Sequence, residues 1–260
     1  MTDNLASGAA AGAWTFSAAV AAQFDEHVTR SIRGYSSIQS IIGRVADWAA
    51  PDSATIADVG CATGATFDVI QRRHPSRRFN LYGYDTSPDM IAAARGRLSE
   101  ADPTGERLSA ELLCVDARDG LAHTDADLTV AVFTLQFLPP SDRLSVLEEL
   151  HARSARHGVL LIAEKTIPSD PRWALIAAEA LWEDKRISGF PGEEIVAKTE
   201  SLRGVLRPLD ESLCIAEPVL AGWRAPFVLW AEWNWRLVGY FYESTPHPEP
   251  HATVADQRRP

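Results

Sequence analysis

Thr55-Ile-Ala-Asp-Val-Gly-Cys-Ala-Thr-Gly64 predicts a short buried strand that runs into a turn flanked by two glycines. Glycine has no Cβ atom, so its backbone can approach a bound ligand closely. Twenty-one residues after Gly64, a second apolar run at 79–84 ends in Asp85. An acid at the end of the second strand can accept hydrogen bonds from both hydroxyls of a ribose. The pattern predicts a site for an adenosine-type cofactor.

The form of the turn distinguishes between two kinds of adenosine cofactor. Dinucleotide folds commonly carry Gly-x-Gly-x-x-Gly, which brings a helix N-terminus to a pyrophosphate. Here only Gly60 and Gly64 are present, and Asp58 precedes them. A carboxylate at that position would repel a pyrophosphate but hold the ammonium group of S-adenosylmethionine, which has a ribose diol and no phosphate. The turn therefore favours a methyltransferase over a nicotinamide dehydrogenase, whereas without Asp85 it would indicate only an ordinary tight turn.

Strand and helix patterns alternate through the middle of the chain. Strands are predicted at 55–59, 79–84, 110–115, 127–133 and 157–163, and helices at 64–73, 88–99 and 141–153. Helices at 24–33 and 38–48 precede them, and helices at 168–184 and 193–207 and apolar runs at 226–231 and 235–242 follow. This alternation predicts an α/β fold with a mainly parallel sheet covered by helices on both faces. Ligands bind such sheets at the carboxyl ends of the strands, near Asp58 and Asp85.

Composition limits the choice of partner and compartment. The 260 residues include 25 Lys+Arg and 35 Asp+Glu, and the formal charge of −10 disfavours nucleic acid as a partner. Neither the three cysteines nor the histidines have metal-ligand spacing. The first residues do not resemble a signal peptide, and no apolar run is long enough to span a membrane. We therefore expect a cytoplasmic protein with a small-molecule substrate and no metal or membrane partner.

One domain is expected between residues 21 and 242, with a helical lid inserted at about 168–208. Residues 1–20 are small and mostly apolar and are expected to form a flexible N-terminus. Residues 243–260 carry proline and histidine without periodic apolar residues, a composition typical of a disordered tail.

Several short segments follow one another in an order that is more specific than the turn alone. They are Phe24-Asp25, Arg33-Gly-Tyr35-Ser, Asp58-Val-Gly-Cys61, Phe133-Thr-Leu-Gln-Phe-Leu138, Glu164-Lys165, Lys185-Arg186, Gly189-Phe190 and Glu194-Ile195. Together they resemble the carboxy-S-adenosylmethionine synthase family. The resemblance implies a divergent member with a Class I S-adenosylmethionine-dependent methyltransferase fold, a Rossmann-like seven-stranded sheet and a homodimeric assembly. Proper members convert S-adenosylmethionine and prephenate into a carboxylated sulfonium compound used in modifying tRNA.

The resemblance also implies where S-adenosylmethionine is held. Gly60, Cys61 and Ala62 would line its amino-acid end, and Asp85 and Thr86 would hold the ribose. Asp116 and Ala117, after the third strand, would contact the adenine, while Tyr35, Phe133 and Thr134 would enclose the pocket. The full set of predicted cofactor-binding residues is Tyr35, Asp58, Gly60, Cys61, Ala62, Gly64, Asp85, Thr86, Met90, Asp116, Ala117, Phe133 and Thr134.

Two departures from the family pattern concern the carboxylated product. The family has an arginine after the lysine that matches Lys198, and this arginine grips the extra carboxylate; here the residue is Thr199. A hydroxyl cannot reproduce a bidentate guanidinium contact. The family's asparagine before Phe133 is Val132 here, and Arg203 is a candidate replacement for the lost arginine. These changes favour plain methyl transfer to another acceptor.

Acceptor and catalytic residues are predicted on the lid helices and in the segment before the first strand. Trp173 and Trp182, on the lid helices, together with Arg186, Thr199 and Arg203, are the candidate acceptor contacts, and Tyr35 and His27 are the candidate catalytic residues. The tryptophans at 223–235 are interpreted as core and dimer packing in preference to an aromatic wall. The acceptor is expected to be a small molecule, and an aromatic secondary metabolite is the candidate class. Two alternatives stay open: carboxy-S-adenosylmethionine synthesis from prephenate, and a non-catalytic S-adenosylmethionine-binding dimer that assists a partner enzyme.

Overall fold

A computed structural model of the chain describes residues 16–243. The expected disordered tail lies outside these residues except for Glu243, and so does most of the expected flexible N-terminus. No helix in the described part of the chain is long and apolar enough to cross a membrane.

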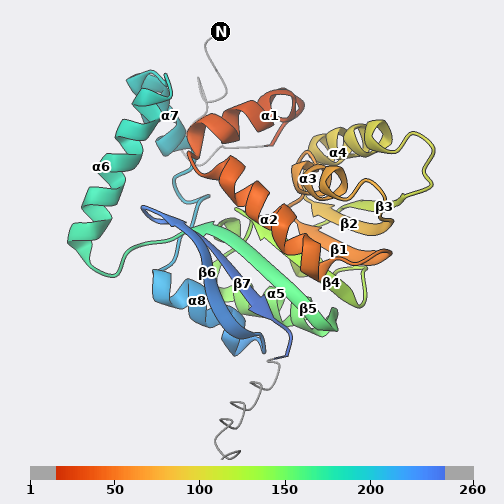
Figure 1. Cartoon of the computed structure of the whole chain (residues 1–260). Helices are drawn as coiled ribbons and strands as arrows, with labels where there is room; N and C mark the ends of the chain where they lie inside the picture. Colours follow the sequence, from red (N-terminus) through yellow and green to blue (C-terminus); the bar gives the residue numbers. More distant parts are fainter. Residues whose placement is uncertain (1–15, 244–260) are drawn as a thin grey trace, which may run out of the picture.

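The centre of the molecule is one seven-stranded sheet (Figure 1). Its strands are β1 (Ala54–Val59), β2 (Phe79–Asp85), β3 (Leu108–Cys114), β4 (Ala126–Val132), β5 (Ser154–Lys165), β6 (Arg224–Glu232) and β7 (Trp235–Phe241). Their order across the sheet is β3-β2-β1-β4-β5-β7-β6. The first five strands pair in parallel, whereas β7 is antiparallel to both β5 and β6. The chain reverses its winding direction between β1 and β4, so the carboxyl ends of these two strands flank the crevice in which such sheets bind ligands.

Helices cover both faces of the sheet (Figure 1). On one face, α2 (Tyr35–Ala49), α3 (Ala65–Arg73) and α4 (Pro88–Ala101) bury one core with Ile56 of β1. On the other face, α5 (Pro140–Ala152) packs beside α8 (Glu211–Leu220) and contributes to a second core with Ala57. Neighbouring residues of β1 thus point to opposite cores, as the period of a strand requires. The predicted α/β fold with its mainly parallel sheet is confirmed.

Several elements differ from the predicted boundaries, and one helix was not predicted. Helix α1 (Ala18–Ser31) begins six residues before the predicted start, because its alanine-rich first turns favour a helix, so residues 18–20 belong to the folded domain. Strand β5 begins at Ser154, next to an irregular register between Ala126 and Leu128. Helix α8 was not predicted, although Asp210 caps it by accepting a 2.9 Å hydrogen bond from the backbone N–H of Ser212.

Two helices follow β5 and stand beside the carboxyl edge of the sheet. Helix α6 (Pro171–Ile187) extends away from the sheet in Figure 1 and buries only Ala177 among its residues. Helix α7 (Gly192–Ser201) turns back toward α1 and buries Ile195. These helices correspond to the predicted pair, except that α6 lies three residues further along the chain than predicted and α7 ends at Ser201 instead of reaching 207.

Candidate active site

The turn after β1 has the conformation that its glycines suggest. Gly60 and Gly64 both have a φ of +77°, and Ala62 between them has a φ of +46°. The N–H groups of Gly60 and Cys61 donate to the carbonyl oxygen of Tyr84 at 2.7 and 2.9 Å, which ties the turn to the end of β2. Residues other than glycine adopt this left-handed conformation at a cost, so the two glycines relieve strain at both ends of the turn.

Gly60 is also required by a close approach of its neighbour across the crevice. A Cβ atom on Gly60 would lie 2.1 Å from Oγ1 and 2.6 Å from Cγ2 of Thr134. Thr134 follows β4 and begins the short 3₁₀ helix Leu135–Phe137. The carboxyl ends of β1 and β4 therefore approach each other so closely that the Thr134 side chain packs directly against the Gly60 backbone, and both residues line the cavity described below.

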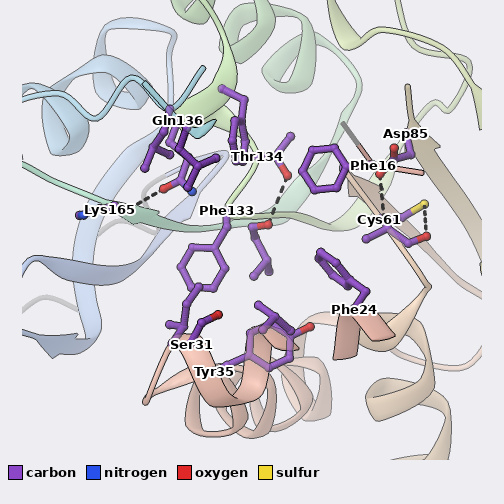
Figure 2. A pocket seen from close by; sticks show the side chains of 18 of the residues that line it. Phe16, Phe24, Ser31, Tyr35, Cys61, Asp85, Phe133, Thr134, Gln136 and Lys165 are labelled. Atoms are coloured by element: carbon purple, nitrogen blue, oxygen red, sulfur yellow. Dashed lines mark hydrogen bonds between the residues drawn. The ribbon is translucent and has the colours of Figure 1, made fainter. Parts of the chain in front are cut away.

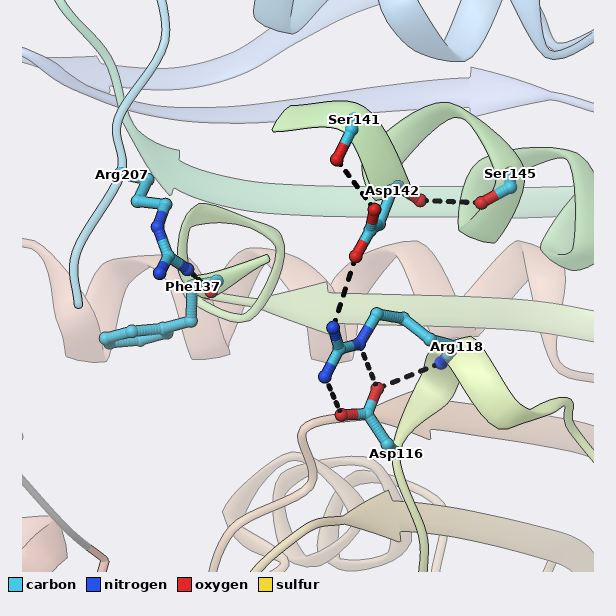
Figure 3. Close-up of polar contacts among 7 residues, drawn as sticks. All are labelled: Asp116, Arg118, Phe137, Ser141, Asp142, Ser145 and Arg207. Atoms are coloured by element: carbon cyan, nitrogen blue, oxygen red, sulfur yellow. Dashed lines mark hydrogen bonds and ion pairs between the residues drawn. The ribbon is translucent and has the colours of Figure 1, made fainter. Parts of the chain in front are cut away.

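Two strand-end acids stand beside this turn. Asp85, at the end of β2, accepts hydrogen bonds from the N–H groups of Ala62 (3.0 Å) and Ser87 (2.8 Å). Burial raises the pKa of Asp85, and these backbone hydrogen bonds oppose that effect. Asp116, after β3, is bound by Arg118 at 2.7 Å, and this contact lowers the pKa of Asp116 (Figure 3). Both carboxylates are thus fixed in position at one end of the crevice.

Asp58 lies beneath the turn and is fully buried at 1% exposure. Its Oδ1 atom has no hydrogen-bond partner among residues 16–243. Burial raises the pKa of Asp58 to about 7, a hydrogen bond from Thr66 opposes this, and the charge of Asp85 raises it further. A buried carboxylate with an unsatisfied oxygen would be stabilised by a cation, as in the ammonium group of S-adenosylmethionine.

Protonation of Asp58 predicts a pH-dependent stability. The pKa of Asp58 is about 7 in the folded chain and 3.8 for an aspartate exposed to water, so between these pH values the unfolded chain releases a proton that the folded chain keeps. The stabilising contribution is therefore complete below pH 3.8 and is lost as the pH rises through 7. Asp58→Asn does not titrate, and its free energy of unfolding should rise relative to wild type by up to about 4 kcal/mol across this window. Urea unfolding between pH 4 and 8 measures the difference.

Asp52→Asn is the matched control for this experiment. Hydrogen bonds from Arg78 lower the pKa of the exposed Asp52 to about 2, so this acid is already ionised throughout the window. A difference between Asp58→Asn and wild type that stays constant from pH 4 to 7 would contradict the assignment.

A cavity of about 530 Å³ extends from the turn toward the lid helices. Its volume lies within the usual range for small-molecule sites. Aromatic rings form much of its wall: Phe133 lies 6.3 Å from Tyr35 and 5.1 Å from Trp235, measured between ring centroids (Figure 2). Phe16, just before α1, contacts Phe24 at 6.2 Å and helps to enclose the cofactor end. Trp235 therefore contributes to an aromatic wall, whereas Trp223 is fully buried in the core as predicted.

The two candidate catalytic residues both line this cavity. Burial, reinforced by the charge of Asp25, raises the pKa of Tyr35, so its phenol stays protonated and is a poor base. His27 is 8% exposed, and its Nε2 atom lies 3.2 Å from Nζ of Lys198. Its ring packs edge-on against Phe190, which follows α6. His27 therefore joins α1 to the lid helices at the far end of the cavity.

Basic side chains gather at the end of the cavity nearest the lid helices. The sequence patterns did not predict these residues as ligand contacts. Those that line the cavity there are Lys165, Lys185, Lys198 and Arg207. The Arg207 guanidinium donates to the carbonyl oxygen of Phe137 at 2.8 Å (Figure 3). The position of the lid decides which residues reach the cavity, and a single sequence carries no direct signal for it.

Most predicted cofactor residues come together at the cavity, but some predicted residues do not line it. Gly64 packs against Ala94, Met90 is fully buried beneath the turn, and Asp58 lies under the cavity floor. None of the five predicted acceptor residues lines the cavity: Trp173, Trp182, Arg186, Thr199 and Arg203. The reason is the direction of the lid helices, which leaves Trp173 63% exposed and turns the hydroxyl of Thr199 to the carbonyl oxygen of Ile195.

The fold and the site together define a Class I S-adenosylmethionine-dependent methyltransferase. The defining features are a mainly parallel sheet with this strand order, a glycine-flanked turn, and acids at the ends of the first three strands. Residues 56–158 match the family described as "Methyltransferase domain". The chain belongs to the carboxy-S-adenosyl-L-methionine synthase family. It is 35% identical to the carboxy-S-adenosyl-L-methionine synthase of Chromohalobacter salexigens, over 75% of this chain and 71% of that protein. It is also 35% identical to the Geobacter metallireducens protein of the same name, over 74% and 78% of the two chains.

Solved structures support the fold at lower sequence identity. An O-methyltransferase family protein from Burkholderia thailandensis superimposes with a TM-score of 0.60 at 17% identity. PigF with SAH superimposes with a TM-score of 0.58 at 16% identity. Each match covers 86% of this chain but only 59% of the other. The protein is an S-adenosylmethionine-dependent enzyme of this fold, and the buried Asp58 carboxylate with its unsatisfied oxygen fits that cofactor.

Proposed function

We propose that the protein transfers the methyl group of S-adenosylmethionine to a small-molecule acceptor. The observation that carries the proposal is the single cavity lined by the turn after β1 at one end and by aromatic and basic side chains under the lid at the other. Thr199 stands at the position of the family's carboxylate-binding arginine. In the described part of the chain it does not line this cavity. An aromatic acceptor would pack against Phe133 and Trp235.

The cofactor contacts form one end of the proposed site. Gly60, Cys61 and Ala62 would receive the amino-acid end of S-adenosylmethionine, with Asp58 below it. Asp85 and Thr86 would lie along the ribose, and Asp116 and Ala117 along the adenine, since all of them except Asp58 line the same part of the cavity. Tyr35 and Thr134 would separate this end from the acceptor.

Position and alignment account for catalysis in this proposal. S-adenosylmethionine supplies an activated methyl group on a sulfonium, and the bond to sulfur breaks as the acceptor atom bonds to the methyl carbon. The chain then needs only to hold the acceptor in line, and such positioning can supply much of the rate enhancement. A base is required only for an acceptor that must lose a proton. His27 is the histidine placed to accept it, since it lines the cavity.

The test is incubation with S-adenosylmethionine labelled at the methyl group, together with candidate acceptors. We expect label in a small molecule and an equal amount of S-adenosylhomocysteine. Binding of S-adenosylhomocysteine without transfer of label to any acceptor would contradict methyl transfer.

Carboxy-S-adenosylmethionine synthesis from prephenate is the second candidate. It is favoured by the names of the relatives at 30–35% identity and by the cationic side chains in the lid end of the cavity. Mass spectrometry of the ligand that co-purifies with the protein separates the two candidates. A sulfonium compound heavier by one carboxyl group would favour this candidate over methyl transfer.

We further propose that the protein is a cytoplasmic homodimer that functions in small-molecule biosynthesis. The support for a dimer is the apolar surface of α6, where Trp173, Leu175 and Ile187 are more than 60% exposed. Exposed apolar patches of this kind commonly mark interfaces. Sedimentation should give twice the mass of one chain, and Trp173→Glu should give the mass of one. A monomeric wild-type protein at micromolar concentration would contradict the proposal.

A reducing compartment agrees with Cys61, Cys114 and Cys214, which are all free.

A further inference from the structure

Lysine is confined to one place in this molecule. The whole chain contains only three lysines, Lys165, Lys185 and Lys198, and all its other basic residues except histidine are arginine. All three lysines line the cavity. Lysine carries a compact charge on a flexible stem, whereas arginine presents a planar fork that is always protonated. Lysine ammonium groups therefore occur only around the cavity, and arginine supplies the positive charge elsewhere in the chain.

Two of these lysines share a part of the cavity. Lys165 ends β5, and Lys185 lies in the last turn of α6. Burial lowers the pKa of Lys165, while burial and the nearby positive charge of Lys165 lower the pKa of Lys185 to about 8. The Lys165 ammonium also lies 5.6 Å from the centre of the Trp235 ring. The two ammonium groups are therefore close enough to repel each other in a partly desolvated space.

The acids next to these lysines in the sequence are paired with arginines instead. Glu164 accepts two hydrogen bonds from Arg143, at 2.9 and 3.1 Å. Asp184 is bound by Arg33 at 3.0 Å. Within residues 16–243, no carboxylate lies within 4.0 Å of the Nζ atom of Lys165 or Lys185. Among the residues that the structure describes, the positive charge of this pair is thus left without a counter-ion.

Other cavity-lining charges do not neutralise the pair. Asp85 is bound by backbone N–H groups and Asp116 by Arg118. Glu194 stands one helical turn before Lys198 on α7, a spacing at which opposite charges attract. The indole Nε1 of Trp235 is a buried donor without a partner in the described part of the chain. Besides the two ammonium groups, a further unused donor therefore lies on the wall that Lys165 contacts.

We propose that Lys165 and Lys185 form a subsite for an anionic group of the acceptor, with the Trp235 indole N–H as a further donor. The inference rests on the proposed function, because it assigns a chemical class to the acceptor of that same cavity. Two partly buried ammonium groups without a counter-ion are unfavourable, and a carboxylate or a phosphate would supply the missing charge and accept their hydrogen bonds. The aromatic wall would then hold the remainder of an acidic aromatic molecule.

The test compares a carboxylate probe with its neutral amide of nearly equal shape, and adds a phosphate probe. With S-adenosylhomocysteine at saturation, calorimetry measures the binding of 4-hydroxybenzoate, 4-hydroxybenzamide and phenyl phosphate. Wild-type protein should bind one of the two anions at least about tenfold more tightly than the amide, as expected for charge-assisted hydrogen bonds. The anion that binds tells whether the group is a carboxylate or a phosphate. Wild-type protein that binds neither anion more tightly than the amide overturns the proposal.

Variants assign the preference to the two lysines. Lys165→Met and Lys185→Met should each reduce the preference for the anion, and the double variant should remove it. Because the substitutions relieve repulsion, the double variant without ligand should melt at the same or a higher temperature than wild type at pH 6.5. Arg203→Gln, which removes an exposed cation outside the cavity, should keep the preference. A preference that survives in the double variant overturns the assignment.

Failure of this inference can be told from failure of the proposed function. The affinity for S-adenosylhomocysteine and the transfer of labelled methyl are measured on the same protein samples. Normal cofactor binding and methyl transfer without an anion preference would reject only the subsite. Anion binding by a protein that does not bind S-adenosylhomocysteine would reject the proposed function.

Discussion

Gly60→Ala is expected to reduce methyl transfer by about 100-fold or more, because a small displacement of a bound reactant can cost that much. The new Cβ atom would lie 2.1 Å from Oγ1 of Thr134, and the φ of +77° would add strain. Either the turn or the start of the 3₁₀ helix after β4 must move, and both line the cofactor end of the cavity. Calorimetry with S-adenosylhomocysteine should show a weakened affinity in parallel.

Gly105→Ala separates the collision from the backbone strain. Gly105 has a φ of +67°, close to that of Gly60, but a Cβ atom there would have no neighbour within 4 Å. This variant should lose only the stability that the strained φ costs, about 1–2 kcal/mol, and should keep its cofactor affinity. Equal effects of the two substitutions on cofactor binding would refute the role given to the contact between Gly60 and Thr134.

Arg143→Met should lower the free energy of unfolding by about 3–5 kcal/mol, the usual cost of leaving buried charge uncompensated. Arg143 is completely buried, with its guanidinium bound to Glu164 at 2.9 Å and to Glu217 at 2.7 Å. It joins α5, β5 and α8, so its removal leaves the buried Glu164 carboxylate and the partly buried Glu217 carboxylate without their shared cation. Chemical denaturation at neutral pH measures the loss.

Two further variants test whether uncompensated charge is the cause. Arg72→Met removes an exposed partner of Asp68 on α3 and should leave the free energy of unfolding nearly unchanged. Arg143→Met combined with Glu164→Gln removes one of the stranded charges and should recover part of the loss. A double variant that is less stable than Arg143→Met would argue that packing, not charge, explains the effect.

Local patterns were sufficient to predict much of the fold. The alternation of apolar strands and amphipathic helices predicted the central strands and α2 through α5 to within a few residues. Helix α8 was missed because its ten residues are mostly apolar and include Pro218, so neither helical periodicity nor propensity marks it. It forms because tertiary packing against α5 outweighs local preference.

The cofactor end of the site could be predicted because its residues follow strands at fixed positions. Gly60, Asp85 and Asp116 reach the cavity through the geometry of the sheet alone. The lid end depends on how α6 and α7 are oriented, and that is fixed by long-range contacts. Arg203 was therefore chosen where Arg207 lines the cavity, and Trp173 was chosen on a helix that points away from it.

The two halves of the cavity differ in how tightly the rest of the fold holds them. The turn after β1 is bonded to the end of β2 and packed under α4, whereas α6 has one buried residue in its whole length. Substitutions on α6 thus disturb little of the hydrophobic interior. Replacement of α6 and α7 could therefore change the acceptor during evolution while the nucleoside-binding end of the cavity is retained. Chimeric proteins joined at the end of β5 would make the same exchange in the laboratory.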